Sequence, residues 1–124
     1  MKLIIAGSRN LEVTSRFIDS VLFQFDYPYI YSKSSDEIVS GGEIGIDSCG
    51  EIFAESMGIK LTRFPASVRN HGRAAGPIRN QEMADYADGL LLIWDGTSRG
   101  SLDMKTRMIA LKKPIYEVIL KKTN

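Results

Sequence analysis

Short apolar runs alternate along this chain with longer stretches in which apolar residues recur every three or four positions. The runs predict β-strands, and the recurrence predicts amphipathic helices. Strands are expected at residues 3–6, 37–40, 59–64, 89–94 and 114–120. Because strand and helix alternate throughout, the pattern predicts an α/β fold of the Rossmann-like, three-layer α/β/α kind, with a parallel sheet of about five strands.

Four helices are expected between these strands. Thr14 is predicted to cap the first, Gly58 to end the second, and Pro77 to lie in the first turn of the third. The fourth is expected at about residues 101–111, and residues 26–35 and 65–76 are predicted to be loops. The apolar positions of the first three helices are Val13, Phe17, Ile18, Val21, Leu22 and Phe25, then Cys49, Ile52, Phe53 and Met57, then Ile78, Met83, Ala84 and Ala87.

Composition narrows the class of protein. The 124 residues are 44% hydrophobic and 25% charged, which is typical of one globular domain spanning residues 1–124. Sixteen Lys and Arg against 15 Asp and Glu give a net charge of +1, without the basic excess of a strong nucleic-acid binder. A single cysteine, Cys49, excludes an internal disulfide framework. No apolar stretch has the length of a membrane span or a signal peptide, so a cytoplasmic protein without a membrane partner is predicted.

The residues that could carry chemistry follow the predicted strands. Loops after parallel strands gather at the carboxyl edge of the sheet, where ligands bind. Four segments are expected to converge there, at residues 7–9, 40–47, 71–80 and 95–101. Their glycines permit close approach to the backbone, and each leads into a helix whose N-terminus favours an anion. The arginines in or beside them, Arg9, Arg69, Arg73, Arg79 and Arg99, suit phosphate, so a phosphate-bearing small molecule is the predicted ligand.

Several other chemistries find little support. Neither G-x-G-x-x-G nor G-x-x-x-x-G-K-[ST] occurs, so the usual dinucleotide fingerprint and the Walker A loop are both excluded. Residues 96–100 match G-x-S-x-G, but His71 precedes Ser98, whereas hydrolases with this motif place the histidine after the serine. His71 and Cys49 have too few ligand-type neighbours for a metal site, and neither a metal nor a cofactor is predicted. For Trp94, packing in the core is favoured over stacking on a base.

Four segments give the chain a resemblance to a known family. They are Ala6-Gly7-Ser8-Arg9, Val39-Ser40-Gly41-Gly42 with Gly45 and Asp47, Gly76-Pro77-Ile78-Arg79-Asn80 with Met83, and Asp95-Gly96 with Gly100-Ser101. With these the sequence resembles the YspA-like branch of the SLOG superfamily, which also contains the LOG phosphoribohydrolases and the Rossmann-like domain of DprA. The resemblance covers nearly the whole chain, and Gly-Pro-Ile-Arg-Asn-x-x-Met is its most specific part. It implies a single SLOG-like domain that binds a nucleotide or a nucleotide-derived molecule.

The converging loops and the resemblance together predict a ligand-binding set. Its members are Gly7, Ser8, Arg9, Ser40, Gly41, Gly42, Gly45, Asp47, Arg79, Asn80, Asp95, Gly96, Gly100 and Ser101. Arg79 is expected to clasp a phosphate through two parallel hydrogen bonds and to matter little for folding. A side chain at Gly42 is expected to prevent binding, because it would strain the backbone or fill the ligand's place.

One position bears on catalysis. LOG enzymes carry P-G-G-x-G-T-x-x-E, whose glutamate helps to cleave the bond between base and ribose phosphate. When Gly100-Ser101 is aligned with the Gly-Thr of that motif, Met104 occupies the glutamate position, and a thioether cannot act as a general acid or base. Met104 is expected to face the pocket. The carboxylates that could act in place of the glutamate are Asp47, Glu82, Asp95 and Asp103.

Three functions are compatible with these features. The leading prediction is a sensor or sequestering module that binds a nucleotide-like small molecule. The first alternative is an N-glycosidic hydrolase of nucleoside phosphates or NAD-like molecules. The second is a DprA-like binder of single-stranded DNA, which the charge balance and the lack of an aromatic ladder disfavour. A homo-oligomer is compatible with each of them.

Overall fold

The computed structural model describes residues 1–25 and 36–121, so the predicted loop at 26–35 lies outside the described residues. The elements, in chain order, are β1 (Lys2–Gly7), α1 (Ser15–Gln24), β2 (Glu37–Ser40), α2 (Ile46–Met57), β3 (Lys60–Arg63), α3 (Val68–His71), the 3₁₀ turn η1 (Gly72–Ala74), α4 (Ala75–Tyr86), β4 (Gly89–Trp94), α5 (Arg99–Ala110) and β5 (Ile115–Ile119). Each predicted strand is therefore present, with ends that differ by at most one residue.

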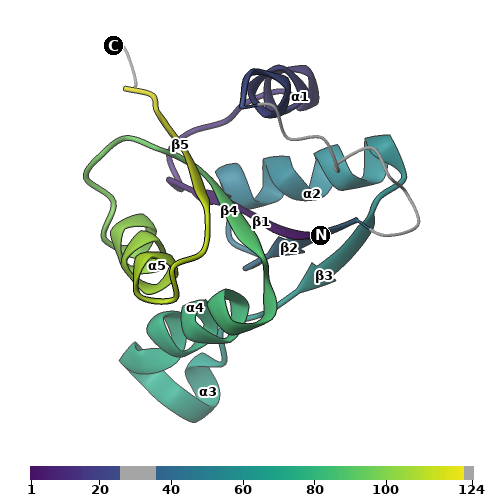
Figure 1. The fold of residues 1–124 in the computed structure, drawn as a ribbon. Coiled ribbons are helices and arrows are strands. Elements are labelled where there is room, and N and C mark those ends of the chain that lie inside the picture. The colour runs from purple at the N-terminus through teal and green to yellow at the C-terminus, as the bar shows by residue number, and fades with distance from the viewer. Residues whose placement is uncertain (26–35, 122–124) are drawn as a thin grey trace.

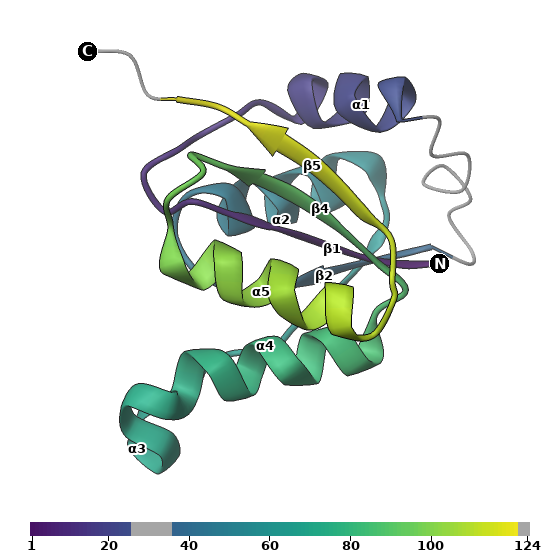
Figure 2. The same cartoon turned by 60° about the vertical axis from the view of Figure 1, so that its left-hand side comes forward.

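The five strands form one parallel sheet in the order β3-β2-β1-β4-β5. Helices α1 and α2 cover one face of this sheet, and α4 and α5 cover the other (Figures 1 and 2). The predicted Rossmann-like, three-layer fold is confirmed. The chain builds outward from β1 to β3 and then crosses to place β4 on the other side of β1. The strand order therefore reverses between β1 and β4, which is where such sheets bind ligands.

Alternating side chains of the central strands fill two cores. Leu3, Ile5, Leu91 and Ile93 pack toward α1 and α2, while Ile4, Ala6, Leu90 and Leu92 pack toward α4 and α5. Helix α2 lies so close to β1 that a Cβ atom on Gly50 would stand 2.8 Å from the Ile5 side chain. Burial of the central strands on both faces explains why their sequences read as continuous apolar runs.

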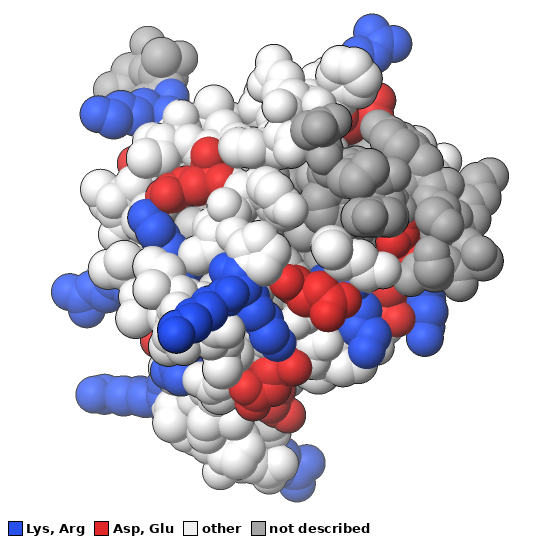
Figure 3. Space-filling view, in the orientation of Figure 1, with Lys and Arg blue, Asp and Glu red and all other residues white. Residues whose placement is uncertain are grey.

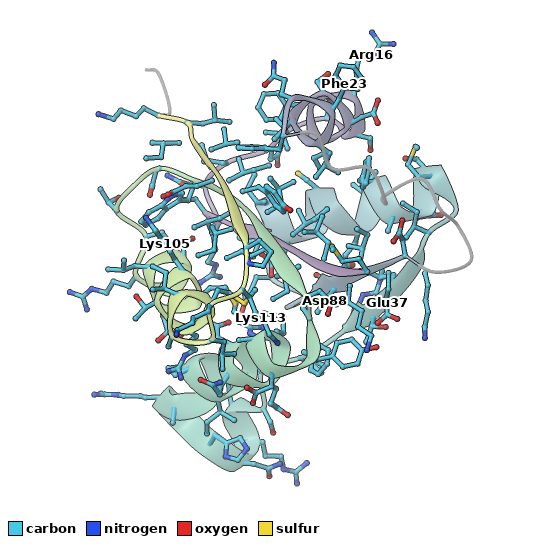
Figure 4. All side chains as sticks on the ribbon, in the orientation of Figure 1. Arg16, Phe23, Glu37, Asp88, Lys105 and Lys113 are labelled. Carbon is cyan, nitrogen blue, oxygen red and sulfur yellow. The ribbon has the colours of Figure 1, made fainter. Side chains whose placement is uncertain are left out.

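The predicted helix signals are present. The Oγ1 of Thr14 accepts a hydrogen bond of 3.0 Å from the backbone N–H of Phe17, which caps α1. Gly58 ends α2 in the left-handed conformation, with φ of 67°. Pro77 lies in the first turn of α4. Lys113 adds a cap that the sequence did not reveal: its Nζ donates to the carbonyls of Ala84, Asp85 and Ala87 at the C-terminal end of α4, at 2.7, 3.1 and 2.7 Å (Figure 4).

Three residues expected on the apolar faces of helices are exposed: Phe25, Ile52 and Ile78. Ile52 is exposed, because it lies outside the buried face of α2. The residues of that buried face are Ile46, Cys49, Phe53 and Ala54. Phe25 is also exposed, because it forms the C-cap of α1 instead of extending its buried face.

Residues 65–76 are not one loop, since they contain α3, η1 and the first two residues of α4. The short α3 and η1 bury none of their residues, so they leave no apolar periodicity in the sequence. Helix α5 begins at Arg99, two residues earlier than predicted, because Ser98 serves as its N-cap. Trp94 is buried in the core, as predicted, and its Nε1 donates to Glu117 over 2.8 Å. No helix of the described residues is long and apolar enough to cross a membrane.

Candidate functional site

A cavity of about 260 Å³ opens at the carboxyl edge of the sheet, where the strand order reverses. It is lined by Ala6, Gly7, Arg9, Glu43, Asp47, Arg79, Asn80, Met83, Ser98, Gly100, Ser101 and Met104. These residues come from the end of β1 and the loop after it, the β2–α2 connection, the first turn of α2, helix α4, Ser98 and the start of α5. Each of the four predicted segments therefore contributes to the cavity, although the third does so only through Arg79 and Asn80.

The predicted ligand-binding set divides in two. Gly7, Arg9, Asp47, Arg79, Asn80, Gly100 and Ser101 line the cavity, whereas Ser8, Ser40, Gly41, Gly42, Gly45, Asp95 and Gly96 do not. The serines of the second group shape loops. The Oγ of Ser8 accepts the backbone N–H of Asp95 at 2.9 Å, which joins the loops after β1 and β4. The Oγ of Ser40 accepts the N–H of Gly42 and donates to Glu51.

The glycines after β2 have distinct roles. A Cβ atom on Gly41 would lie 2.7 Å from Arg79 Nη1 and 2.8 Å from Asp47 Oδ2, so this residue allows the close packing behind the cavity. Gly42 has φ of +76°, but a Cβ there would meet nothing within 4 Å. Of the two effects expected at Gly42, the left-handed φ supports backbone strain, and occupation of the ligand's place stays a prediction.

Arg79 is built into the fold. Its residue surface is only 7% exposed, and its Nη1 donates to the carbonyl of Gly41 at 2.6 Å. Its Nε donates to Asn80 Oδ1 at 3.0 Å, and its Nη2 lies 3.7 Å from Glu43 Oε1. The expectation that Arg79 matters little for folding is thus corrected, because its guanidinium holds α4 against the β2–α2 connection.

Asn80 positions the start of α5. Its Nδ2 donates to Asp103 Oδ2 at 2.9 Å and to the carbonyl of Gly100 at 3.4 Å. Asp103 in turn pairs with Arg107 at 2.9 Å. This chain of contacts fixes the first turn of α5 relative to α4 and occupies the Asp103 carboxylate with Asn80 and Arg107.

Asp47 places a carboxylate in the cavity wall. The residue is 5% exposed, and burial raises its pKa to about 6. The positive charge of Arg79 and hydrogen bonds from the backbone of Glu43 and Gly7 oppose this rise, while the negative charge of Glu43 adds to it. Asp47 is therefore ionised near neutral pH. The free-energy cost of burying its charge is offset only in part by Arg79 and the backbone hydrogen bonds.

The first turn of α5 supplies hydrogen-bond donors. The Ser98 Oγ accepts the N–H of Ser101 at 3.4 Å, whereas the N–H groups of Arg99 and Gly100 have no acceptor within the helix. Ser101 is 4% exposed and lines the cavity. Among the side chains of the described residues, its Oγ is the one buried polar atom without a hydrogen-bond partner. Such orphaned groups are rare in proteins, and this one belongs to a residue of the cavity lining at a helix N-terminus, where anions bind.

Of the four candidate carboxylates, only Asp47 lines the cavity. Glu82 is exposed and lies outside the lining. Asp95 accepts the backbone N–H groups of Thr97 and Ser98, and these bonds lower its pKa. Met104 lines the cavity, as predicted, from the second turn of α5, and it also packs in the core beside Met83.

Some residues of the cavity were not predicted as ligand contacts. Ala6 and Glu43 fall in this group, and the position of Glu43 between Gly42 and Gly45 was the signal that could have revealed it. Conversely, Arg69, Arg73 and Arg99 are exposed and do not line the cavity. Ser98, the serine of the G-x-S-x-G match, is a helix cap. In the described part of the chain, no group of three or more His, Cys, Asp and Glu could hold a metal ion.

Charge over the wider surface is mixed. On the face shown in Figure 3, Lys and Arg side chains are interspersed with Asp and Glu and form no continuous basic patch. Within the cavity, two carboxylates (Glu43 and Asp47) accompany two guanidinium groups (Arg9 and Arg79). Attraction of an anion therefore depends on local donors more than on net charge.

Comparison with known proteins supports the fold. No protein-family model and no curated protein matches the chain. Its structure is similar to the X-ray structure of DNA processing protein A (DprA) from Streptococcus pneumoniae, with a TM-score of 0.69 and 18% sequence identity. The match covers 99% of this chain and 52% of that chain, so this chain spans about half the length of DprA. The protein thus has a DprA-like, Rossmann-like α/β fold.

Proposed function

We propose that this protein binds a nucleotide or nucleotide-derived phosphorylated small molecule in the cavity between β1 and β4, and that it acts as a sensor or a sequestering module. A phosphate of the ligand accepts hydrogen bonds from the first turn of α5. The proposal includes membership of the YspA-like branch of the SLOG superfamily, to which the four glycine-rich segments point.

The unpartnered hydroxyl of Ser101 carries this proposal. A buried hydroxyl without a partner destabilises a fold by about 1–3 kcal/mol, so its place in the cavity wall calls for a ligand acceptor. The neighbouring N–H groups of Arg99 and Gly100 supply two more donors, and the helix dipole favours a negative charge at the same point. Arg9, whose side chain is exposed at the cavity, adds a cation.

Ser101→Ala tests the proposal, because it separates binding from stability. Removal of an unpartnered buried hydroxyl should leave the free energy of unfolding unchanged or raise it. Affinity for a phosphorylated ligand should fall by about 1.5–3 kcal/mol, the scale of a hydrogen bond to a charged group. A thermal-shift screen of nucleoside mono-, di- and triphosphates identifies the ligand, and calorimetry then measures its affinity for both proteins.

Ser20→Ala is the matched control. Its hydroxyl also belongs to a helix, but it donates to the carbonyl of Arg16 on α1, outside the cavity lining. This variant should bind as the wild type does. Equal affinity of Ser101→Ala and wild type for the identified ligand would contradict the proposal, as would a screen in which no nucleotide raises the melting temperature.

The two alternatives give different results in the same assays. Hydrolysis of an N-glycosidic bond would rest on Asp47, the one candidate carboxylate in the cavity, and chromatography would detect free base after incubation with nucleoside monophosphates or NAD. The second alternative, binding of single-stranded DNA, follows from the likeness to DprA. The described residues that line the cavity, however, include no aromatic side chain for stacking bases. Salt-dependent binding of oligonucleotides with no response to mononucleotides would favour that function.

A further inference from the structure

The two outer strands of the sheet differ in how their free edges are protected. Strand β3, on one side, is four residues long, and the side chains of its Lys60 and Arg63 are 69% and 61% exposed. Exposed cations on an outer strand discourage pairing with another chain. Strand β5, on the other side, is five residues long, contains no Lys, Arg or Pro, and carries one charged residue, Glu117. The edge of β5 therefore lacks the protection that β3 has.

Backbone groups of β5 point away from the sheet at alternate residues. The carbonyl of Pro114 accepts a hydrogen bond from β4 at 3.0 Å, and the N–H of Leu120 donates to β4 at 2.8 Å. Because backbone groups alternate in direction along a strand, the even-numbered residues of β5 face β4. The odd-numbered residues, Ile115, Glu117 and Ile119, direct their N–H and C=O groups to the free side. On that side the described part of the chain places no helix or strand (Figure 2).

The sequence of β5 is complementary to itself in one arrangement. In an antiparallel pair, opposite residues with free backbone groups exchange two hydrogen bonds. If two copies of β5 run antiparallel about a two-fold axis at Glu117, then Ile115 lies opposite Ile119 of the second copy, and Glu117 lies opposite its equivalent. Three residue pairs then exchange two hydrogen bonds each, and isoleucine packs beside isoleucine at both ends. On the other face of the strands, Tyr116 lies opposite Val118, an aromatic and β-branched pair.

Charge at the centre of this arrangement is balanced. Lys105, from α5, holds its Nζ 3.0 and 3.1 Å from the two carboxylate oxygens of Glu117, and Trp94 Nε1 donates to the same carboxylate at 2.8 Å. The axis therefore brings two carboxylates and two ammonium groups together, which offsets the repulsion of like charges that face each other. A register shifted by two residues would instead place Glu117 opposite an isoleucine, and a shift by one would oppose free backbone groups to groups already bonded to β4.

We infer that the free edge of β5 binds a second copy of this chain, antiparallel and centred on Glu117, so that two five-stranded sheets join into one. An interface of this kind presents the same surface from both copies, as two-fold dimers do. Because the paired strands are antiparallel, the carboxyl edges of the two sheets point in opposite directions. None of the five residues of β5 lines the cavity, so each copy keeps its own cavity. The inference thus goes beyond the proposed function and does not depend on it.

The first experiment measures the mass of the protein by light scattering after size-exclusion chromatography, at concentrations from about 1 to 500 μM. Wild type should approach 27.6 kDa, twice the chain mass of 13.8 kDa, as the concentration rises. Ile119→Lys, which introduces a cation at a position that is 55% exposed, should raise the dissociation constant of the dimer at least about tenfold. Leu102→Lys is the matched control, because Leu102 is 52% exposed but lies on α5, and it should leave the dimer intact.

The second experiment tests the register by oxidative cross-linking. Glu117→Cys should form a disulfide between two copies, since opposite residues of a hydrogen-bonded pair have Cα atoms about 5.5 Å apart, within the range that a disulfide spans. Ile115→Cys should not, because its equivalent in the second copy lies four residues further along the ladder, about 13 Å away. Wild type, whose buried Cys49 is its one cysteine, gives the background.

Three results would overturn the inference. They are a wild type that stays at 13.8 kDa at the highest concentration, a dimer that folded Ile119→Lys leaves unchanged, and cross-linking of Ile115→Cys as fast as that of Glu117→Cys. Urea denaturation checks that each variant is folded, and if Ile119→Lys is not, the two cysteine variants decide. Nucleotide binding is measured separately: a folded, monomeric variant should bind as wild type does, so failure of the proposed function would leave the dimer standing, and the reverse.

Discussion

A carboxylate is buried at each edge of the sheet, and the pKa values of these two carboxylates are shifted in opposite directions. At the amino edge, Glu37 begins β2 and accepts the hydroxyl of Tyr86, while Lys60 lies 3.4 Å away (Figure 4). Burial raises the pKa of Glu37, but the hydrogen bonds from Tyr86 and Thr62 and the charge of Lys60 outweigh burial, so the net pKa is lowered. At the carboxyl edge, burial prevails, and the pKa of Asp47 is raised to about 6.

The contacts at the amino edge therefore stabilise the fold, whereas the carboxyl edge leaves polar groups available for binding a ligand. At the amino edge, the Lys2 ammonium also lies 4.1 Å from the centre of the Tyr86 ring. Lys113 donates three hydrogen bonds to the end of α4 at the same edge. The carboxyl edge leaves the hydroxyl of Ser101 without a partner. Buried groups that are incompletely compensated are found most often at functional sites.

Loss of Arg79 should have the largest effect on stability. Arg79→Met would leave the Gly41 carbonyl without its 2.6 Å donor and the Asp47 carboxylate without its positive neighbour. We expect the free energy of unfolding to fall by about 3–4 kcal/mol, as measured by urea denaturation. Arg9→Met, which removes an exposed arginine from the same cavity, should change it by less than about 0.5 kcal/mol.

The double variant Arg79→Met/Asp47→Asn sharpens this prediction. If the loss arises from an uncompensated buried charge, removal of the Asp47 charge should recover a substantial part of it. Strictly additive effects of the two substitutions would show that Arg79 stabilises the fold only through its bonds to backbone carbonyls.

Stability should depend on pH in opposite directions at the two edges. The pKa of Asp47 rises from 3.8 to about 6 on folding, so the folded state binds more protons between these values and gains stability as the pH falls from about 7 toward 4. Asp47→Asn should therefore be more stable than wild type at pH 8, by at most about 3 kcal/mol, and the advantage should vanish near pH 4.

Glu37 gives the contrasting case. Its lowered pKa means that its stabilising effect is present above pH 4.5 and is lost as the pH falls through the folded-state value. Glu37→Gln should accordingly be less stable than wild type at pH 7. Denaturation curves recorded from about pH 2 to pH 8 for both variants measure the two slopes, and slopes of the same sign would contradict the comparison.

Lys113→Met should have a smaller effect. It removes three hydrogen bonds to carbonyls at the C-terminal end of α4, where a cation is favoured by the helix dipole. We expect a loss of about 2 kcal/mol in the free energy of unfolding and unchanged ligand affinity. Lys112→Met, at the exposed neighbouring lysine, should be close to neutral.

The sequence predicted the framework well, because strands buried on both faces and amphipathic helices leave periodic signals. It placed the five strands and the caps of α1 and α2, at Thr14 and Gly58. It could not predict which arginines turn inward, since Arg79 and Arg73 look alike until α4 packs against the β2–α2 connection. Nor could it single out Ser101, whose orphaned hydroxyl emerges only when four distant segments enclose one cavity.

Backbone amide chemical shifts, followed by NMR during titration with adenosine monophosphate, report on both edges of the sheet at once. The largest shifts should occur at Gly7, Gly100 and Ser101, around the cavity, and Glu37 and Asp88 at the amino edge should change little. Shifts concentrated at the amino edge, or none at the start of α5 while the ligand binds, would contradict this expectation.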